Sequence, residues 1–417
     1  MVVDSVLLTP DEPAPERTFR SRAAHAGEDA SSPSRPLSAP IHQNSVYAFA
    51  DSHLADAAFA AGDPLYARDG LPNARALERA VADLEGSEDA HAVSSGMAAI
   101  ALTLFALLSS GDHVIVPSDC YCDTRALFTE HFARFGVTAS FIDSDDLTGL
   151  RAAINPRTAL IFAETISNPG MELSDIPGIA NIASAAGAVF MVDNTFATPA
   201  LCRPLEHGAD LVAHSAGKLL SGHHDVTAGV IAGSSALIAR IKRAGYLTGA
   251  LLGPMDAWLA LRGMKTLAPR MAWASQAGEK VARFLSVHPA VSSVRYPGLP
   301  SPRSRELTTR LLPAGAGGIL AFDLAGGASA AANVIHDLKT IPYVPSVGGT
   351  TTTVSYPPQV PKCLSDGTVV AQAYASKTIR LSIGLEDPVD IIADLRAALD
   401  RAAATQFGQL SHTGSRG

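Results

Sequence analysis

The sequence predicts an α/β protein with a mainly parallel sheet, helices on both of its faces, and a smaller C-terminal α+β domain. Short apolar runs alternate with helix-like segments from about residue 74 to about residue 254. This alternation stops near Gly253 and Pro254, where a different pattern begins. At 417 residues, with 47% hydrophobic and 17% charged residues, the chain is long enough for two globular cores. Strand–helix alternation also places a ligand site at the carboxyl ends of the strands.

The first part of the chain contains short apolar runs that predict strands. They are Val114–Pro117, Ala139–Asp143, Ala159–Ala163, Val189–Val192 and Leu211–Ala213. Helices are predicted between and before them: Arg75–Leu84 is amphipathic, Met97–Leu108 is apolar nearly all round, and Ile176–Ala186 is helix-like.

The second part begins with Met255–Phe284, which predicts a long helix interrupted around Pro269. Gly318–Leu324 and Thr378–Ile383 predict strands, and Pro388–Ala403 predicts a closing amphipathic helix. Residues 1–40 are rich in proline, serine and aspartate and lack periodicity. We therefore expect an N-terminal arm at 1–60, a large domain at 61–254, a small domain at 255–403 and a disordered tail at 404–417.

Composition argues against several kinds of partner. The net charge of −8 argues against nucleic acid and anionic membranes. No apolar run approaches the ~18 residues of a transmembrane helix, and residues 1–20 lack the basic and apolar regions of a signal peptide. The four cysteines match no zinc spacing, and no metal site is predicted. We expect a cytoplasmic protein.

Two polar groups follow neighbouring predicted strands. Asp193 ends the run Ala188–Val192, and Lys218 follows the next strand after a polar cluster that begins at His214. A carboxylate and a lysine placed in this way are what pyridoxal phosphate (PLP) requires, because the lysine amine forms an imine and the aspartate keeps the ring nitrogen protonated. The alternative is an ordinary α/β core with a solvated lysine.

Other residues fit a phosphate and an amino-acid substrate. Ser94–Ala99 places small residues at the start of a buried helix, where backbone N–H groups favour a phosphate, although such residues also serve as plain caps. Tyr66 and Arg68 supply a hydroxyl and a guanidinium. Tyr121 suits either stacking on an aromatic ring or ordinary surface packing. Arg380 lies among apolar strand residues and needs a carboxylate, from the protein or from a substrate.

Together these residues resemble the Cys/Met-metabolism family of PLP enzymes. That family includes cystathionine γ-synthase, cystathionine γ-lyase, methionine γ-lyase and O-acetylhomoserine sulfhydrylase. The resemblance covers roughly residues 20–400 and implies PLP-dependent fold type I. Its main motifs are Tyr66-x-Arg68, Leu84-Glu-Gly86, Ser94-Ser-Gly-Met97, Glu164-Thr165, Asn168-Pro169, Val192-Asp-Asn-Thr195, His214-Ser-Ala-x-Lys218, Gly222-His223 and Arg380-Leu-Ser-x-Gly-Leu-Glu-Asp387.

The resemblance implies cofactor and catalytic roles. Lys218 would carry PLP as an aldimine and move protons, Asp193 would pair with the pyridine nitrogen, and Tyr121 would stack on the ring and act as an acid. The residues expected to hold the phosphate are Gly96, Met97 and Ser215.

It also implies substrate and subunit contacts. Asn168, Ser346 and Arg380 would bind the substrate, with Arg380 on its carboxylate. Tyr66 and Arg68 would reach the cofactor of the neighbouring subunit, which implies a homo-oligomer, usually a dimer of dimers.

The chain departs from the family pattern near the expected substrate. Gly217 stands where the family has a threonine whose hydroxyl binds phosphate, so we expect weaker PLP retention. Asp123 introduces a carboxylate that contacts the distal end of a substrate or faces water. Leu65 and Pro345 replace the acids that hold the distal ammonium of cystathionine, which argues against cystathionine as the main substrate.

The expected activity is therefore γ-elimination or γ-replacement on a homoserine-type amino acid, such as methionine or an O-acyl homoserine, through the Lys218 aldimine and a vinylglycine intermediate. One alternative is a cystathionine γ-lyase or γ-synthase, and another is a cysteine β-lyase. A third is a catalytically degenerate partner protein, which the intact Lys218, Asp193, Tyr121 and Arg380 disfavour.

Overall fold

A seven-stranded sheet forms the centre of the structure, a computed structural model that describes residues 17–28, 36–299, 305–356, 360–363, 369–372 and 377–413. In spatial order its strands are β1 (Asp89–Val93), β7 (Gly229–Gly233), β6 (Leu211–Ser215), β5 (Val189–Asp193), β4 (Thr158–Glu164), β2 (His113–Pro117) and β3 (Thr138–Ile142). The strands from β6 to β3 are parallel, and β7 is antiparallel to both β6 and β1. The predicted mainly parallel sheet is confirmed.

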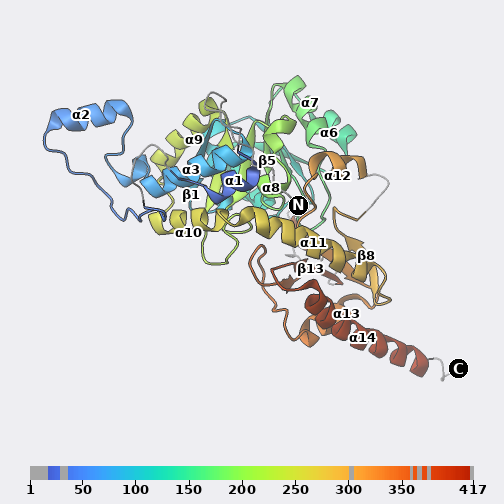
Figure 1. Ribbon diagram of the computed structural model, residues 1–417. Helices are drawn as coiled ribbons and strands as arrows, with labels where there is room; N and C mark the ends of the chain where they lie inside the picture. Colours follow the sequence, from blue (N-terminus) through green and yellow to red (C-terminus); the bar gives the residue numbers. More distant parts are fainter. Residues whose placement is uncertain are drawn as a thin grey trace, which may run out of the picture.

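Both faces of this sheet are buried under helices (Figure 1). Alternate residues of β2 enter different cores: Ile115 joins one, while Val114 and Val116 join the other. The helices of the first core are α3 (Pro72–Glu85), α7 (Ile176–Ala186) and α10 (Pro254–Met264). Those of the second are α4 (Gly96–Leu107) and α9 (Ser235–Thr248).

A second, antiparallel sheet follows in the chain, in the order β10 (Thr353–Ser355), β13 (Thr378–Ser382), β9 (Ile319–Leu324) and β8 (Val291–Arg295). The strands β11 (Val360–Cys363) and β12 (Val369–Gln372) form a separate pair. The accompanying helices are α11 (Leu267–Ser286), α12 (Arg305–Leu311), α13 (Gly327–Asp337) and α14 (Pro388–Thr413). This arrangement confirms the smaller α+β part that the sequence predicted.

Two helices differ from the sequence prediction. The long helix is interrupted between Met264 and Leu267, and Pro269 lies in the first turn of α11. Proline is tolerated there because the first N–H groups of a helix have no partner within the helix. At the C-terminus, α14 continues to Thr413, past Ala403 where the sequence predicted its end.

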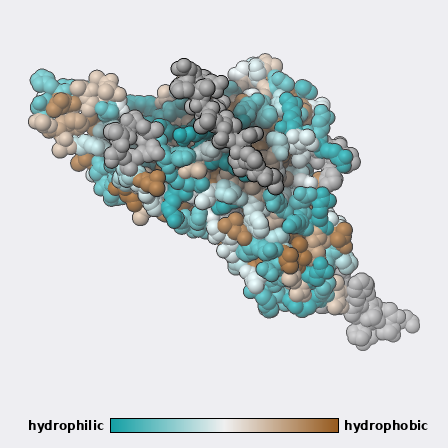
Figure 2. Space-filling view, viewed as in Figure 1, coloured by the Kyte–Doolittle hydropathy of each residue, from teal (hydrophilic) through white to brown (hydrophobic). Residues whose placement is uncertain are grey.

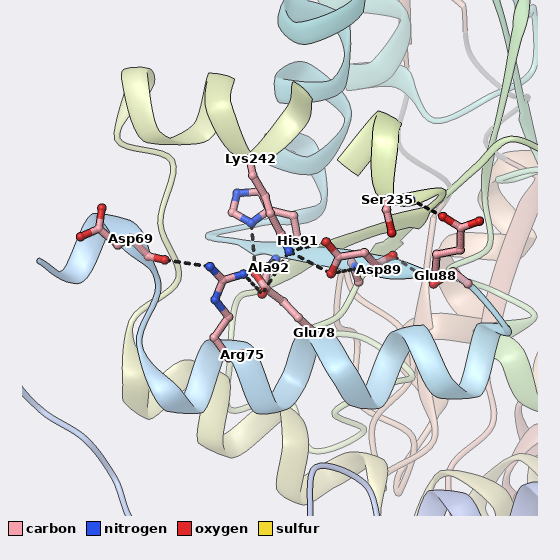
Figure 3. A network of polar contacts seen from close by, with 11 residues as sticks. Asp69, Arg75, Glu78, Glu88, Asp89, His91, Ala92, Ser235 and Lys242 are labelled. Atoms are coloured by element: carbon pink, nitrogen blue, oxygen red, sulfur yellow. Dashed lines mark hydrogen bonds and ion pairs between the residues drawn. The ribbon is translucent and has the colours of Figure 1, made fainter. Parts of the chain in front are cut away.

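The strands β1 and β7 were not predicted from the sequence. Asp89 and His91 interrupt the apolar pattern of β1, and β7 has glycine at both ends, which is a weak strand signal. A polar network fastens β1 to the helices beside it (Figure 3). Glu78 on α3 accepts bonds from His91 and the Ala92 backbone, 3.0 and 2.9 Å away.

The Glu78 carboxylate is nearly inaccessible. Burial opposes its charge, but the hydrogen bond from His91 and the charges of His91, Lys242 and Arg75 outweigh burial, so the pKa of Glu78 lies below its ordinary value. Lys242 on α9 also pairs with Asp89, 2.7 Å away, which ties α9 to the same edge of the sheet.

Four short helices complete the first part of the chain: α1 (Phe19–Ala24), α5 (Cys122–Ala126), α6 (Leu147–Ala153) and α8 (Thr198–Leu201). A further helix, α2 (Ser52–Ala61), projects away from the rest of the molecule and buries none of its residues (Figure 1). Among the described residues, no helix has the length and apolar character needed to span a membrane.

Candidate active site

A half-open cavity lies at the carboxyl edge of the large sheet, where the sequence placed a ligand site. Most of its wall comes from strand ends, from the N-terminus of α4 and from the loop before α5. The predicted residues that line it are Gly96, Met97, Tyr121, Asn168, Asp193, Ser215 and Lys218. Five separate segments of sequence therefore converge on one space.

Asp193 ends β5 and is held in place by Thr195. One carboxylate oxygen accepts the Thr195 backbone N–H, 2.9 Å away, and also the Thr195 hydroxyl. The same hydroxyl accepts the backbone N–H of Ser215 on β6, 2.8 Å away. Thr195 thus fixes the acid of β5 relative to the end of β6, a role that the sequence analysis missed. An Asp followed two residues later by Thr is a local turn signal that points to it.

Lys218 follows β6 and extends toward aromatic side chains. Its Nζ lies 5.5 Å from the centre of the Tyr121 ring and 6.0 Å from that of Phe196. Burial lowers the pKa of Lys218, and the positive charge of Arg380 adds to this effect, while the negative charge of Asp193 opposes it. The result is an amine that loses its proton more readily than an exposed lysine.

The start of α4 forms a small-residue cradle. Ser95 caps this helix by accepting the Ala98 N–H, 3.0 Å away. A side chain at Gly96 would place its Cβ 2.7 Å from the Cβ of Ser215, and one at Gly229 would lie 2.0 Å from the Ser95 carbonyl oxygen. Only glycine leaves the helix N-terminus and the Ser215 hydroxyl next to each other, which suits a phosphate group.

Gly217 is enclosed by the neighbouring backbone. A Cβ at this position would lie 2.3 Å from the Val226 carbonyl oxygen. The threonine typical of the family does not fit here unless the segment before β7 shifts. The expected weakening of PLP retention stays a prediction.

Arg380, on β13 of the second sheet, reaches the cavity wall through Asn168. Its guanidinium donates to Asn168 Oδ1 at 2.9 Å and to Ser355 Oγ at 3.2 Å, and its Nε is buried without a partner among the described residues. Burial lowers the pKa of Arg380 to about 10. No described carboxylate pairs with Arg380, so the internal acid considered in the sequence analysis is absent from the described part of the chain.

Besides Arg380, three predicted residues lie outside the cavity wall. Ser346 is half-buried, and its backbone oxygen accepts the Thr353 hydroxyl at 3.5 Å. Tyr66 is exposed, and the Arg68 guanidinium lies over its ring at 4.4 Å and over the Tyr246 ring at 5.3 Å. Within one chain, the structure does not bring these three residues to Lys218.

Tyr121 is held at the rim by two carboxylates. Its backbone N–H donates to Glu164 at 2.9 Å, and its hydroxyl donates to Asp123 at 2.7 Å. Burial and the Asp123 contact both raise the pKa of Tyr121. The hydroxyl therefore stays protonated across the physiological range.

A buried polar cluster supports the strand ends from behind. Glu85, at the end of α3, accepts from His214 Nε2 at 2.7 Å and from Asn194 Nδ2 at 3.0 Å, and all three side chains are inaccessible. His214 directly precedes Ser215, and Asn194 directly follows Asp193. The motif Leu84-Glu-Gly86 was noticed in the sequence, but nothing in the sequence alone assigned it to this cluster.

The Cys/Met metabolism PLP-dependent enzyme model matches residues 20–400. This chain belongs to that family. L-methionine gamma-lyase of Porphyromonas gingivalis is 39% identical over 390 residues, which cover 92% of this chain and 97% of the relative. Cystathionine gamma-synthase of Mycobacterium bovis is 37% identical over 380 residues, covering 91% and 96%. The family resemblance, the PLP-dependent class and a role in sulfur amino-acid metabolism are confirmed.

A solved structure agrees with the fold. The crystal structure of a putative O-acetylhomoserine (thiol)-lyase from Campylobacter jejuni has a TM-score of 0.83 and 30% identity, covering 92% of this chain and all of the other. It contains N'-pyridoxyl-lysine-5'-monophosphate. The predicted fold type I is confirmed.

The residues of this chain fit pyridoxal phosphate. The glycine cradle at α4 offers backbone N–H groups to a phosphate. Asp193 ends β5, and Lys218 follows β6, the parallel strand that pairs with β5. The described residues contain no cluster of side chains able to hold a metal ion.

Glu164 gives the site a pH dependence that stability measurements can detect. Burial, followed by the charge of Asp193, raises its pKa from 4.5 to about 8. Between these two pH values the unfolded chain is ionised and the folded chain is protonated, so stability is lost as pH rises.

We expect Glu164→Gln to remove this dependence in the cofactor-free protein. The unfolding free energy of the variant minus that of wild type should increase by about 3 kcal/mol from pH 5 to pH 8, because wild type loses stability over this range. One group can change the unfolding free energy by at most ~1.4 kcal/mol per pH unit, so this is close to the largest possible effect. Denaturant unfolding of both proteins at pH 5 and pH 8 measures these unfolding free energies. Glu279→Gln, on an exposed carboxylate, is the control. Equal pH dependence in wild type and Glu164→Gln contradicts the expectation.

Proposed function

We propose that this protein catalyses γ-elimination or γ-replacement on a homoserine-type amino acid with an uncharged sulfur or O-acyl substituent. The observation that carries the proposal is the placement of Arg380 and Asn168 beside Lys218 and Tyr121. This arrangement offers a site for an α-carboxylate at one end and an amine and a phenol at the other. Leu65 and Pro345 replace the two acids with which the family holds a distal ammonium, which favours methionine or an O-acyl homoserine over cystathionine.

Each side chain has one task in this proposal. Pyridoxal phosphate, when bound, supplies the electron-withdrawing ring that makes the substrate's Cα and Cβ hydrogens acidic. Asp193 holds the ring nitrogen protonated, and Gly96, Met97 and Ser215 bind the phosphate. Those roles fit the strand ends and the cradle at α4.

Proton movements are assigned to two groups. The neutral Lys218 amine accepts the proton from Cα, since burial makes its neutral form more accessible. A second proton must leave Cβ before the γ-substituent departs, and it is assigned to the same amine once that amine has released the first proton. The Tyr121 hydroxyl, kept protonated, donates a proton to the departing γ-substituent. Arg380 holds the carboxylate, with Asn168 orienting the guanidinium. Ser346 is assigned to the substrate from the family resemblance.

Identification of the keto acid tests this function. The purified, PLP-saturated enzyme is incubated with L-methionine, O-acetyl-L-homoserine, L-cystathionine or L-cysteine. Release of 2-oxobutyrate from methionine or the acetyl ester supports the proposal. Pyruvate from cysteine would establish β-elimination instead. Turnover of cystathionine alone would show that Leu65 and Pro345 do not determine the preference against a substrate with a distal ammonium.

A homo-oligomer, at least a dimer and as expected a dimer of dimers, is part of the proposal. On helix α2, Leu54 is 53% exposed and Phe59 is 75% exposed. Figure 2 shows hydrophobic residues, in brown and tan, on the surface of this projecting helix. A ten-residue helix without packing is marginal in water, so a partner surface is expected to cover it. Tyr66 and Arg68, which lie away from the Lys218 cavity, would serve the site of the neighbouring subunit.

Subunit mixing tests this arrangement. We expect Arg68→Ala to weaken PLP binding about tenfold or more, because a charge-assisted phosphate contact is lost. Lys218→Ala and Arg68→Ala, each of low activity, are unfolded and refolded together. If Arg68 acts across the interface, hybrids contain one intact site, and about a quarter of wild-type activity returns. No recovery, with hybrids shown by mass, would place Arg68 in its own subunit's site.

The domain limits at residues 60, 254 and 403 and the cytoplasmic location are proposals that rest on the sequence pattern. Limited proteolysis with mass analysis tests the limits, and cell fractionation tests the location.

A further inference from the structure

Asp123 lies at the rim of the site, beside Tyr121, and the proposed function gives its carboxylate no contact with the substrate. Its Oδ2 accepts the Tyr121 hydroxyl at 2.7 Å, and its Oδ1 lies 3.6 Å from the Cys122 thiol. The side chain is exposed, and no basic side chain in the described part of the chain forms an ion pair with it. Its charge is therefore neutralised neither by an ion pair nor by burial.

The position of Asp123 relates it to the distal end of a substrate. The carboxylate of the substrate is assigned to Arg380 and its Cα to the neighbourhood of Lys218. The Tyr121 ring forms the wall beside Lys218, with Nζ 5.5 Å from the ring centre. The hydroxyl end of that ring meets Asp123. Asp123 is not itself in the described cavity wall, but a substrate side chain that leaves Cα along the Tyr121 ring runs toward the hydroxyl end of the ring, where Asp123 is bound.

We propose that Asp123 sets the charge selectivity of the site by excluding amino acids whose γ-substituent ends in a carboxylate or a phosphate. This inference rests on the proposed function and names the residue that keeps anionic γ-substituents out of the site. The physical reason is repulsion between like charges a few ångströms apart at the protein surface, where the effective dielectric constant is lower than in bulk water.

Two variants separate the charge of Asp123 from its hydrogen bond. Asp123→Asn removes the charge and retains an oxygen that accepts the Tyr121 hydroxyl. Asp123→Ala removes both. If Asp123 only positions Tyr121, the alanine variant alone is impaired, and it is impaired equally toward all substrates. If the charge selects, both variants change the preference between neutral and anionic substrates.

Binding of unreactive amino acids provides a first measurement that needs no turnover. L-norleucine and L-2-aminoadipate have similar shape, but the second ends in a carboxylate. Calorimetric titration of the holoenzyme should show at least tenfold weaker binding of L-2-aminoadipate to wild type. The ratio of the dissociation constant of L-2-aminoadipate to that of L-norleucine should be about tenfold smaller in Asp123→Asn than in wild type. High salt should also reduce this ratio in wild type. An unchanged ratio in Asp123→Asn overturns the proposal.

Turnover provides the second measurement. O-succinyl-L-homoserine ends in a carboxylate that O-acetyl-L-homoserine lacks. In wild type kcat/KM should be higher for the acetyl ester. In Asp123→Asn the ratio of the two kcat/KM values should shift at least tenfold toward the succinyl ester. Most of the shift should appear in KM. Glu279→Gln removes an exposed negative charge that is not in the described cavity wall and should leave the ratio unchanged. An equal shift in both variants would assign the effect to net charge and overturn the proposal.

The two measurements also separate this inference from the proposed function. If wild type releases 2-oxobutyrate from neutral substrates but binds norleucine and aminoadipate equally, the selectivity inference fails and the function stands. If it discriminates between them yet turns over no γ-substituted substrate, the function fails and the charge selectivity of the site stands.

Discussion

Lys218→Ala is expected to abolish turnover, with a loss of about 10³-fold or more. Lys218 is the one lysine in the described wall of the cavity, so no other amine is placed to attach the cofactor or to take the Cα proton. The substitution removes a side chain whose surroundings tune its basicity, since burial lowers its pKa. Release of 2-oxobutyrate from L-methionine or O-acetyl-L-homoserine measures the loss.

The Lys218→Ala experiment has a matched control and a clear contrary outcome. Lys280→Ala changes an exposed lysine on α11 and should retain wild-type turnover. Circular dichroism should show that both variants are folded. The absorbance of bound PLP should lose its imine band in Lys218→Ala only. Full turnover in folded Lys218→Ala would refute the mechanism.

Arg380→Lys is expected to lower kcat/KM by about 30-fold to 1,000-fold, corresponding to ~2–4 kcal/mol. The substitution keeps the positive charge but loses the planar fork that binds a carboxylate through two parallel bonds. It also breaks the 2.9 Å bond to Asn168 and the 3.2 Å bond to Ser355 that hold the guanidinium in place. The loss should appear mainly in KM, because Arg380 binds the substrate and takes no proton.

Steady-state kinetics and cofactor absorbance test the Arg380 assignment together. PLP content should match wild type, since no phosphate-binding residue is changed. Arg283→Lys, at an exposed arginine paired with Glu279, should leave KM unchanged. An Arg380→Lys enzyme with normal KM would assign the substrate carboxylate to another group.

Much of the fold could be predicted from the sequence because period and composition specify local structure. The five predicted strands of the large sheet and the helix at Ile176–Ala186 occur at or within two residues of the expected bounds. The strands β1 and β7 were missed because polar residues and glycines hide their period, and their pairing is long-range. Helix limits were less well predicted, since a proline in the first turn of α11 does not end a helix.

The sequence pattern by itself placed Asp193 and Lys218 at one edge of the sheet, and the family resemblance added Gly96 and Tyr121 to that site. Parallel strands bring their carboxyl ends to one edge, so residues that follow successive strands must gather there. Only the tertiary structure shows which side chains hold the site residues in place and which charged groups lie beside them. Arg380 meets Asn168 across 212 positions and Glu85 meets His214 across 129. The hydroxyl of Tyr121 turns to Asp123, and contacts of this kind depend on packing directions that local sequence patterns do not encode.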